Sequence, residues 1–427
     1  MVDAVIAGAG IAGIATAWRL AERLGTTDAV LVDPRPPLSV TSNRPEANYR
    51  DWWPQPAMAE LADRSLGLVD QLLADGAAIP IDRRGYLYVT RDPSRAATLA
   101  RTVDERARAG TSAVGAEVLH SAAIRRRWPH LAPDIVGGVL VHRAGGIDTV
   151  ALGRAMLERA RARGVSIMRA EVIGIDLDRD GVGSVRVLSD DGPRRIETRR
   201  FVNAAGPFAQ PLLDLVGAAL PIETVLRQKV VVRDSHGIVP RTAPFTITLD
   251  RQRIDWTEAE RERLDQTAEG RLLLQELPGG LHSKPDDTAG PDALKLGWAW
   301  DQRPSPPIIA PACPPEFPDM VLRGAQSWIP GLEAASDGAI EAHEGGFYAR
   351  VADGQPVIGP IGPEGSFVVG AMAGFGAMMA AGAGDLAAAW IAGDAPSAPM
   401  RAFQPARFED PAYRLEFESG RVATGEL

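Results

Sequence analysis

The motif Gly8-Ala9-Gly10-Ile11-Ala12-Gly13 decides the fold, because its three glycines match the GxGxxG spacing and stand between two contrasting segments. The short apolar run Val2 to Ala7 before it predicts a buried strand. Ile11 to Leu24 after it carries apolar residues at helical spacing, and Gly25 is a suitable C-cap. A second short apolar run, Ala29 to Asp33, follows. These segments together predict a βαβ unit at the start of the chain.

The glycines of this motif suit a dinucleotide. Gly8 permits the tight turn, Gly10 lets the backbone approach a pyrophosphate, and Gly13 lets helix and strand pack closely. The N-terminus of the following helix favours the phosphate charge. Asp33 lies twenty residues past Gly13, at the end of the second strand, where an acid can bind ribose hydroxyls. The motif predicts a dinucleotide site, against the alternative of a purely structural turn, and does not by itself choose between NAD and FAD.

The composition excludes several classes of protein. The chain has 427 residues, 45% of them apolar and 24% charged, which is typical of a soluble protein with two or three domains. A net charge of -9 argues against nucleic acid or an anionic membrane as the partner. The single cysteine, Cys313, excludes a disulfide framework, and none of the six histidines has metal-ligand spacing. A small-molecule substrate and no metal are therefore expected.

Two further absences bear on location. No segment resembles a membrane span, since the longest weakly polar run, Phe367 to Ala392, is mostly Gly and Ala and contains Asp385. The first residues have neither a charged region nor a signal cleavage pattern, so they are interpreted as a strand. The expected location is cytoplasmic, and the expected oligomeric state is a monomer or a homodimer.

The order of predicted elements divides the chain into two interleaved parts. The pieces 1–85, 145–220 and 340–427 are expected to form one nucleotide-binding domain. The strand-rich pieces 86–144 and 221–339 are expected to form a domain inserted between them. The fold class is therefore α/β (α+β), a Rossmann-like domain with an inserted mixed β-sheet domain.

Three later motifs make the reading more specific. Asn203-Ala204-Ala205-Gly206 follows a predicted strand, Asp353 to Gly359 has the pattern D-G-x-P-x-I-G, and Gly374-Phe375-Gly376 opens the last long helix. With these motifs the sequence resembles, over nearly its whole length, the D-amino-acid-oxidase-like superfamily of FAD enzymes, which includes glycine oxidase and monomeric sarcosine oxidase. The resemblance implies a glutathione-reductase-like FAD domain with an inserted substrate domain. One departure is Ala371-Met372-Ala373, which stands where relatives usually carry Gly-Phe-Ser.

The resemblance also implies which residues contact the cofactor. No cysteine neighbours Gly345-Gly346 in the sequence, where some relatives attach the flavin, so non-covalent FAD is expected and Cys313 is interpreted as inert. The C-terminal glycine loop and helix would face the isoalloxazine end, where backbone N–H groups stabilise negative charge on the reduced ring. The expected cofactor contacts are Gly8, Gly10, Ile11, Ala12, Gly13, Asp33, Arg35, Thr41, Ser42, Val172, Ala205, Gly206, Gly374, Phe375, Gly376, Ala377 and Met378.

Two cations are the expected catalytic residues. Lys295, in Ala293-Leu294-Lys295-Leu296-Gly297, resembles the lysine of the G-L-K-L-G strand in sarcosine oxidases, where a lysine near flavin N5 promotes the reaction with O2. A fixed cation there stabilises superoxide-like charge, whereas the alternative is a lysine on a solvent-exposed face. The chain has only three lysines among 46 basic residues, which favours the functional role. Arg50 falls where the family holds a substrate carboxylate, and a guanidinium fork suits that task; Arg44 is an alternative anion contact, and a structural ion pair of Arg50 is the competing interpretation.

Other positions bear on the substrate pocket. Asn43 stands where relatives often have histidine, and Met378 stands near the place of a second carboxylate-binding lysine. Trp52 and Trp53 follow Arg50 directly, and neighbours in an extended chain point apart. Both are therefore not easily buried, so one is expected in the core and the other in the pocket, unless both are structural. By period two, Trp298 and Trp300 share a strand face opposite to Lys295.

These observations lead to one main hypothesis and two alternatives. The resemblance implies an FAD-dependent oxidase of an amine or amino-acid-like substrate, with hydride transfer from a C–N carbon to flavin N5 and reduction of O2 to hydrogen peroxide. The first alternative is a dehydrogenase of an amine or hydroxy acid with a non-oxygen acceptor. The second is an FAD-stabilised assembly protein without turnover.

Overall fold

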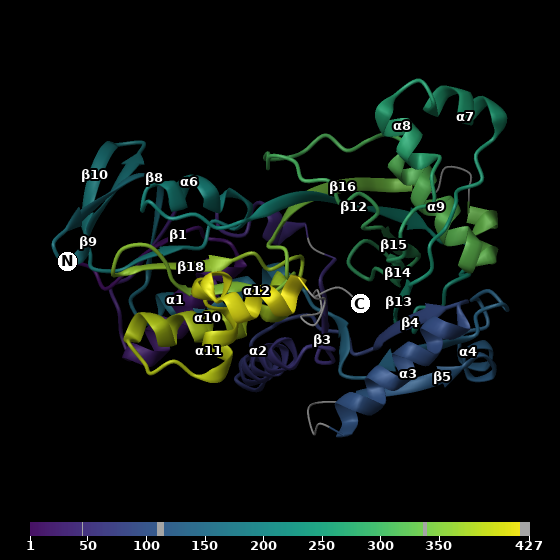
Figure 1. Ribbon diagram of the computed structural model, residues 1–427, viewed down its shortest axis with the longest axis horizontal. Coiled ribbons are helices and arrows are strands. Elements are labelled where there is room, and N and C mark those ends of the chain that lie inside the picture. The colour runs from purple at the N-terminus through teal and green to yellow at the C-terminus, as the bar shows by residue number, and fades with distance from the viewer. Residues whose placement is uncertain (45, 109–114, 336–339, 419–427) are drawn as a thin grey trace.

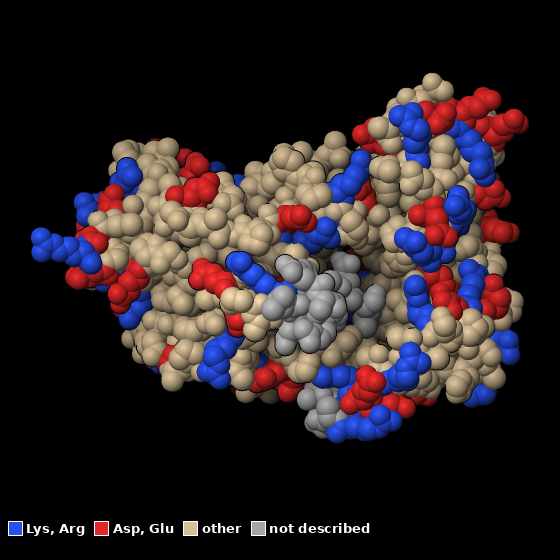
Figure 2. Space-filling model, in the orientation of Figure 1, with Lys and Arg blue, Asp and Glu red and all other residues tan. Residues whose placement is uncertain are grey.

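The computed structural model describes residues 1–44, 46–108, 115–335 and 340–418. Two lobes lie side by side, and each is built on an eight-stranded mixed sheet (Figure 1). Acidic and basic side chains are intermixed over both lobes on the face drawn in Figure 2, where no broad area of one sign appears. In the part of the chain that the structure describes, no helix is both long and apolar enough to cross a membrane.

The first sheet is the nucleotide-binding type that the opening motif predicts. Its strand order is β10-β9-β8-β2-β1-β11-β18-β17, in which β8, β2, β1, β11 and β18 are parallel and the outer strands are antiparallel. Parallel strands need helical crossovers, so both faces of this central part are buried. The strands are β1 Val5–Ala7, β2 Val30–Asp33, β8 Ser166–Asp178, β9 Gly181–Ser189, β10 Gly192–Glu197, β11 Phe201–Asn203, β17 Val357–Pro360 and β18 Ser366–Gly370.

Helices α1 (Ile11–Leu24) and α10 (Gly376–Ala392) pack against each other in the core of this lobe. Their backbones approach closely, since a Cβ on Gly384 would lie 2.4 Å from the carbonyl carbon of Ala15. Helices α2 (Pro56–Ala74) and α5 (Thr149–Arg161) complete the layer. The one acid of the apolar helix α10, Asp385, forms ion pairs with Arg19 at 2.9 Å and Arg64 at 2.6 Å. A buried acid is tolerated only with such partners, and here it ties α10 to α1 and α2.

The second sheet has the order β16-β12-β15-β14-β13-β4-β6-β5. One face packs on α9 (Phe317–Trp328) through a core that includes Leu87, Val230, Leu294 and Trp298. The strands are β4 Tyr86–Thr90, β5 Ala116–His120, β6 Gly137–Val141, β12 Glu223–Arg233, β13 Phe245–Thr248, β14 Leu281–Pro285, β15 Ala293–Gly297 and β16 Ile340–Arg350. The opposite face is called the inner face below, and it carries Tyr86, Tyr88, Phe245, His282, Lys284, Lys295, Lys229 and Tyr348, which the strand register places on one side.

Shorter elements connect the lobes. β3 (Asn48–Arg50) pairs with β7 (Ala144–Gly146) in a small sheet of its own, close to the second lobe in sequence and space. The strand β16 lies within the segment 340–427, expected in the nucleotide-binding domain, and pairs in the second sheet. The other helices are α3 Pro93–Arg108, α4 Ser121–Arg127, α6 Ala209–Asp214, α7 Glu258–Leu264, α8 Ala268–Leu273, α9 Phe317–Trp328, α11 Ala398–Phe403 and α12 Pro411–Glu418.

Candidate active site

A cavity of about 740 Å³ lies in the first lobe along the carboxyl ends of the parallel strands. Its wall comes from chain segments that are far apart in the sequence, chiefly residues 7–12, 32–36, 38–42, 170–173, 204–208, 347–349 and 369–374. This is where an open α/β sheet binds a nucleotide. The predicted cofactor contacts that line it are Gly8, Gly10, Ile11, Ala12, Asp33, Arg35, Thr41, Ser42, Val172, Ala205, Gly206, Gly374, Gly376 and Ala377.

Two glycines of the motif pack so closely against neighbouring backbone that no side chain would fit there. A Cβ on Gly8, whose φ is +109°, would lie 2.4 Å from the carbonyl oxygen of Ala204. A Cβ on Gly13 would lie 1.9 Å from the carbonyl oxygen of Gly8, so Gly13 supports the motif from behind rather than lining the cavity. The N–H of Ile11 donates to the Ser42 hydroxyl at 3.0 Å. The motif is therefore shaped by close packing on one side and left open on the other.

Asp33 ends β2 and fixes the loop that follows β1. Its carboxylate accepts a hydrogen bond from the N–H of Ala9 and another from the N–H of Arg35, each at 2.9 Å. Beside it, the Arg35 guanidinium lies 5.3 Å from the ring of Phe208, and Arg35 Nε is buried without a hydrogen-bond partner in the described structure. Asp33 therefore orders the nucleotide loop in addition to presenting oxygens at the cavity.

The opposite end of the cavity is bounded by the loop before α10. Ala371 and Ala373 both have left-handed φ values, of 52° and 48°. An L residue there costs of order 1 to 2 kcal/mol relative to the right-handed region, and such strain gathers at functional sites. Gly374 next to them faces Tyr348 of β16, since a Cβ on it would lie 2.3 Å from that ring. The change to Ala371-Met372-Ala373 thus keeps a glycine-like path at the expense of strain.

Arg50 lies beyond this loop in a box of aromatic rings. Its guanidinium carbon is 3.9 Å from the ring centroid of Trp53, 5.4 Å from that of Tyr86 and 5.8 Å from that of Phe375. The residue is only 4% exposed and donates a hydrogen bond to the Tyr88 hydroxyl. Among the described residues no carboxylate forms an ion pair with Arg50, and its Nε has no hydrogen-bond partner. Phe375 therefore faces Arg50 rather than the cavity, and the expectation of a structural ion pair at Arg50 has no support.

The burial of Trp52 and Trp53 agrees with the alternative in which both are structural. Both are buried, at 1% and 0% exposure, and neither lines the cavity. They point apart as expected, but each meets a different core: Trp53 packs in the first lobe, edge-on to Phe375 at 4.7 Å, and Trp52 packs with Tyr86 and Val139 in the second. Two adjacent tryptophans are buried here because β3 runs between the lobes.

Lys295 lies on the inner face, opposite to Trp298, as the alternation predicts. Its Nζ is 2.7 Å from a carboxylate oxygen of Asp286, and it does not line the cavity. Burial raises the pKa of Asp286, but the charge of Lys295 outweighs it, and the pKa falls to about 2. Lys295 is therefore a buried cation with an acidic partner.

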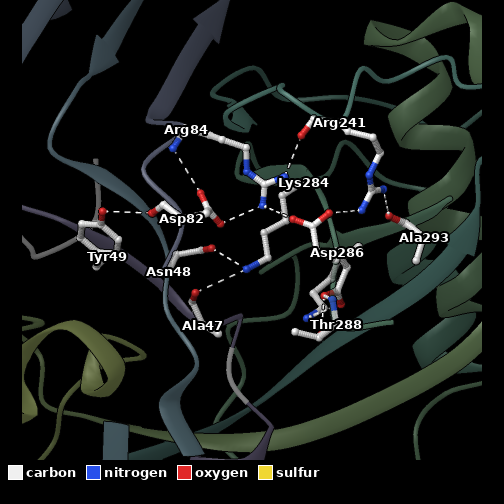
Figure 3. A network of polar contacts seen from close by, with 12 residues as sticks. Ala47, Asn48, Tyr49, Asp82, Arg84, Arg241, Lys284, Asp286, Thr288 and Ala293 are labelled. Atoms are coloured by element: carbon white, nitrogen blue, oxygen red, sulfur yellow. Dashed lines mark hydrogen bonds and ion pairs between the residues drawn. The ribbon is translucent and has the colours of Figure 1, made fainter. Parts of the chain in front are cut away.

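The other two lysines of the chain lie beside Lys295. Sequence patterns did not predict this cluster. Lys284 on β14 is directly opposite Lys295, and Lys229 on β12 is diagonal to it. Each of the three is 8% exposed. Lys284 donates to the carbonyl of Ala47 and, at 2.8 Å, to the Asn48 side chain (Figure 3). It also donates to the carbonyl of Glu46. Lys284 thus holds the segment that leads into Arg50.

Three other predicted features fall nearby. Arg44 donates to the carbonyl of Gly345 at 3.0 Å and does not line the cavity. Met378 is buried in the core of α10. Cys313 is distant from Gly345 in the sequence but not in space, since a Cβ on Gly345 would lie 2.8 Å from its sulfur. Burial raises the pKa of the Cys313 thiol, which disfavours the thiolate. In the described ranges no group of three or more His, Cys, Asp or Glu side chains is placed to hold a metal ion.

Comparison with known proteins agrees with this arrangement. The profile of the FAD dependent oxidoreductase (DAO) family matches residues 3–390. The chain belongs to this family. Because the family depends on FAD, the cofactor of the protein is FAD. The cavity fits this group: Gly8 and Gly10 present bare backbone, Asp33 lies at the end of the second strand, and Gly376 opens a helix N-terminus toward it.

Individual relatives place the chain within the family. Sarcosine oxidase subunit beta from Rhizobium meliloti (strain 1021) is 29% identical over 248 residues, which span 56% of this chain and 56% of that protein. The alignment thus covers little more than half of the relative. The solved structure of L-proline dehydrogenase from P. horikoshii superposes with a TM-score of 0.78 at 20% identity, over 96% of this chain and 98% of that one. Glycine oxidase from Bacillus cereus ATCC 14579 gives a TM-score of 0.70 at 18% identity, over 92% and 95%. At these identities the structures share the fold with this protein.

Proposed function

We propose that this FAD-dependent oxidoreductase oxidises the C–N bond of an amino-acid-like substrate whose carboxylate is held by Arg50. The observation that carries the proposal is the state of Arg50: a buried guanidinium, boxed by aromatic rings beside the loop that ends the cavity, without an acidic partner in the described structure. A buried charge is costly unless it is paired, and a carboxylate of the substrate supplies the missing partner. The aromatic rings around the fork would pack against apolar parts of the substrate.

The relatives support the substrate class. Their names specify sarcosine, L-proline and glycine, and a further structure with a TM-score of 0.72 at 20% identity is iminodiacetate oxidase from Chelativorans sp. BNC1. Each of these compounds carries a carboxylate and an amine nitrogen. We extend this shared chemistry, and not any one of the compounds, to the present chain.

The residues that line the cavity would hold FAD without a covalent link. Gly8 and Gly10 would admit the pyrophosphate, Asp33 and Arg35 would lie at the ribose end, and Gly374 and Gly376 would lie beside the ring system. When bound, FAD accepts a hydride from the substrate carbon. The protein's own part is to hold the carboxylate at Arg50 and to keep water out of an aromatic-walled site.

For the electron acceptor we propose O2, because Lys295 is a buried cation on the inner face, where charge on reduced oxygen would be stabilised. The ion pair of Lys295 with Asp286 at 2.7 Å favours a second candidate, a dehydrogenase with another acceptor, since the paired carboxylate offsets the cation. The two candidates differ in one rate, the reoxidation of the reduced enzyme by air.

The first experiment identifies the reaction. The purified protein is mixed anaerobically with sarcosine, glycine, L-proline, other D- and L-amino acids, simple amines and hydroxy acids, and loss of the visible absorbance of the oxidised flavin is followed. Amino acids are expected to bleach the flavin, and Arg50→Met is expected to weaken their binding by about 10- to 100-fold, the range for a charge-assisted pair. Arg44→Met, which removes a guanidinium outside the box, is the matched control. A protein that no compound bleaches would instead be the assembly protein without turnover.

The second experiment decides the acceptor. The photoreduced enzyme is mixed with oxygenated buffer in a stopped-flow instrument. If O2 is the acceptor, reoxidation is fast and Lys295→Met slows it at least about tenfold, the loss expected for one preorganised charge. Asp286→Asn, which frees Lys295 from its partner, is expected to leave the rate unchanged or raise it. Slow reoxidation of the native enzyme, with rapid reduction of an added quinone, would establish the dehydrogenase.

A further inference from the structure

Glu46 occupies a position on the inner face that no part of the proposed function has used. Its carboxylate oxygen Oε1 is 3.5 Å from Nε2 of His282, and it lies against Gly297, where a Cβ would meet it at 2.7 Å. The lysine cluster (Lys229, Lys284 and Lys295) surrounds it, with Lys284 bonded to its backbone carbonyl. Glu46 is therefore the acid at the centre of the chain's three lysines.

The carboxylate of Glu46 is ionised but incompletely paired. Burial raises its pKa, whereas the contact with His282 and the charges of Lys229 and Lys295 lower it, and the pKa lies well below its usual range. Its second oxygen, Oε2, is buried and has no hydrogen-bond partner in the described structure. His282 does not fill the gap, because its Nε2 faces the other carboxylate oxygen, Oε1, at 3.5 Å, and its Nδ1 lies 2.9 Å from the Gly280 carbonyl.

A buried acceptor without a donor is costly, by about 1 to 3 kcal/mol or more for a charged group, and native proteins leave few of them. The lysines do not remove this cost. Lys295 is bonded to Asp286 at 2.7 Å, and Lys229 lies 3.4 Å from Glu344. No donor among the described residues satisfies Oε2 of Glu46, and an N–H group of a bound ligand would do so.

The surroundings of Glu46 connect it to both parts of the candidate site. The negative charge of Glu46 contributes, after burial, to raising the pKa of Tyr348, which lines the FAD cavity. It also acts on Tyr86, whose pKa is raised by burial, lowered by Arg50 and raised again by Glu46. Tyr86 belongs to the box around Arg50. The ring of Tyr86 lies 4.2 Å from that of Phe245, which lies 4.9 Å from that of His282, the residue in contact with Glu46. One row of rings therefore joins Glu46 and Arg50, a buried anion and a buried cation.

We propose that Glu46 accepts a hydrogen bond from the substrate's amine nitrogen while Arg50 holds its carboxylate. The pair is complementary to a zwitterion, so the substrate class narrows to amino acids with a free N–H, in preference to hydroxy acids and to amines without a carboxylate. This inference rests on the proposed function, because it assumes that Arg50 binds the substrate. Glu46 is a specificity-determining residue here, and it takes no part in the transfer of electrons.

The test compares ligands that differ only at the nitrogen. Sarcosine is paired with butyrate, and L-proline with cyclopentanecarboxylate, in which a methylene replaces the N–H. Dissociation constants for the carboxylic acids come from perturbation of the flavin spectrum, and those for the amino acids from the concentration dependence of anaerobic flavin reduction. The ratio of the two constants measures recognition of nitrogen alone, whereas loss of Arg50 would weaken both members of a pair.

Glu46→Gln is expected to weaken amino-acid binding by about 10- to 100-fold, as for a charge-assisted hydrogen bond, and to change the binding of the matched carboxylic acid by less than about threefold. Glu46→Asp, which keeps the charge, is expected to retain part of the preference. The matched control is Glu344→Gln, because Glu344 also lies beside Lys229 but is half-exposed. It is expected to leave the ratio unchanged.

The outcomes separate this inference from the proposed function. If amino acids bleach the native flavin and Glu46→Gln weakens both members of each pair equally, or neither, Glu46 serves only the lysines and the inference is overturned. If no amino acid bleaches the flavin, the proposed function itself fails. Unchanged melting temperature and flavin content in Glu46→Gln establish that a change in the ratio does not come from a damaged fold.

Discussion

Gly13→Ala provides a direct test of how the cofactor site is built. The added Cβ would lie 1.9 Å from the carbonyl oxygen of Gly8, whereas ordinary van der Waals contact begins at 3.4 Å. The start of α1 and the loop after β1 must therefore separate by roughly 1.5 Å, and Gly8 is itself packed against Ala204. Overpacking of this kind costs about 1 to 3 kcal/mol, which exceeds the gain of about 1 kcal/mol from alanine in a helix. The loop that would carry the pyrophosphate moves with it.

The expected result is FAD binding about 10- to 100-fold weaker, since each 1.4 kcal/mol is about tenfold, together with a lower melting temperature of the apoprotein. Quenching of FAD fluorescence on titration into apoprotein measures the first, and a thermal melt the second. Gly67→Ala in α2 is the matched control, because a Cβ there meets nothing within 4 Å, and it should stabilise the protein by about 0.5 to 1 kcal/mol. Equal FAD affinity and equal melting temperature in the two variants would refute the argument from close packing.

Three further predictions concern other parts of the chain. Arg407→Met leaves the carboxylate of Asp353, which is 1% exposed, without its 2.9 Å partner. Urea titration should show a free energy of unfolding lower by about 3 to 5 kcal/mol. The control, Arg194→Met, breaks the exposed ion pair with Asp191 and should change that free energy by less than about 1 kcal/mol. Burial lowers the pKa of Lys284 from 10.5 to about 7. Between these pH values the unfolded chain binds one proton more than the folded chain, so the free energy of unfolding rises with pH. Urea titrations at a series of pH values should show this rise in the native protein and not in Lys284→Met, and an identical slope in both proteins would contradict the prediction. Asp33→Asn can keep only one of the bonds to Ala9 and Arg35, so it should release FAD more readily by about tenfold, measured by dialysis and flavin absorbance.

Local patterns predicted the first lobe well. The helix expected over Ile11 to Leu24 has those bounds in the structure, and Gly25 ends it with a φ of 80°. These features depend on residues that are neighbours in the sequence. The strands farther along the chain depend on distant partners, since β8 pairs with β2 on one side and with β9 on the other. The ends of such strands are set by pairing with partners, which the sequence does not show.

The inner face shows what local patterns cannot predict. Alternation along β15 placed Lys295 opposite to Trp298, and the structure agrees. The positions of Lys229 and Lys284 beside it depend on the register of β12, β14 and β15, and β12 is far from the other two strands in the sequence. Glu46 lies in a segment without a regular pattern, so nothing in the sequence linked it to those lysines. A rare residue type that recurs on several strands of one sheet is the signal that would have prompted a search.

The division of the cavity wall among distant segments has a consequence for biosynthesis. Gly8 and Ala377 line the same cavity, and at translation rates of about 5 to 20 residues per second roughly 20 to 75 seconds pass between their synthesis. The apolar strand β1 emerges early and must wait for β11 and β18, which flank it or lie next in the sheet. A nascent chain therefore has no complete flavin site until the start of α10, with Gly376 and Ala377, has been made. The vitamin-derived cofactor would then act as a late checkpoint, stabilising only chains that extend through α10.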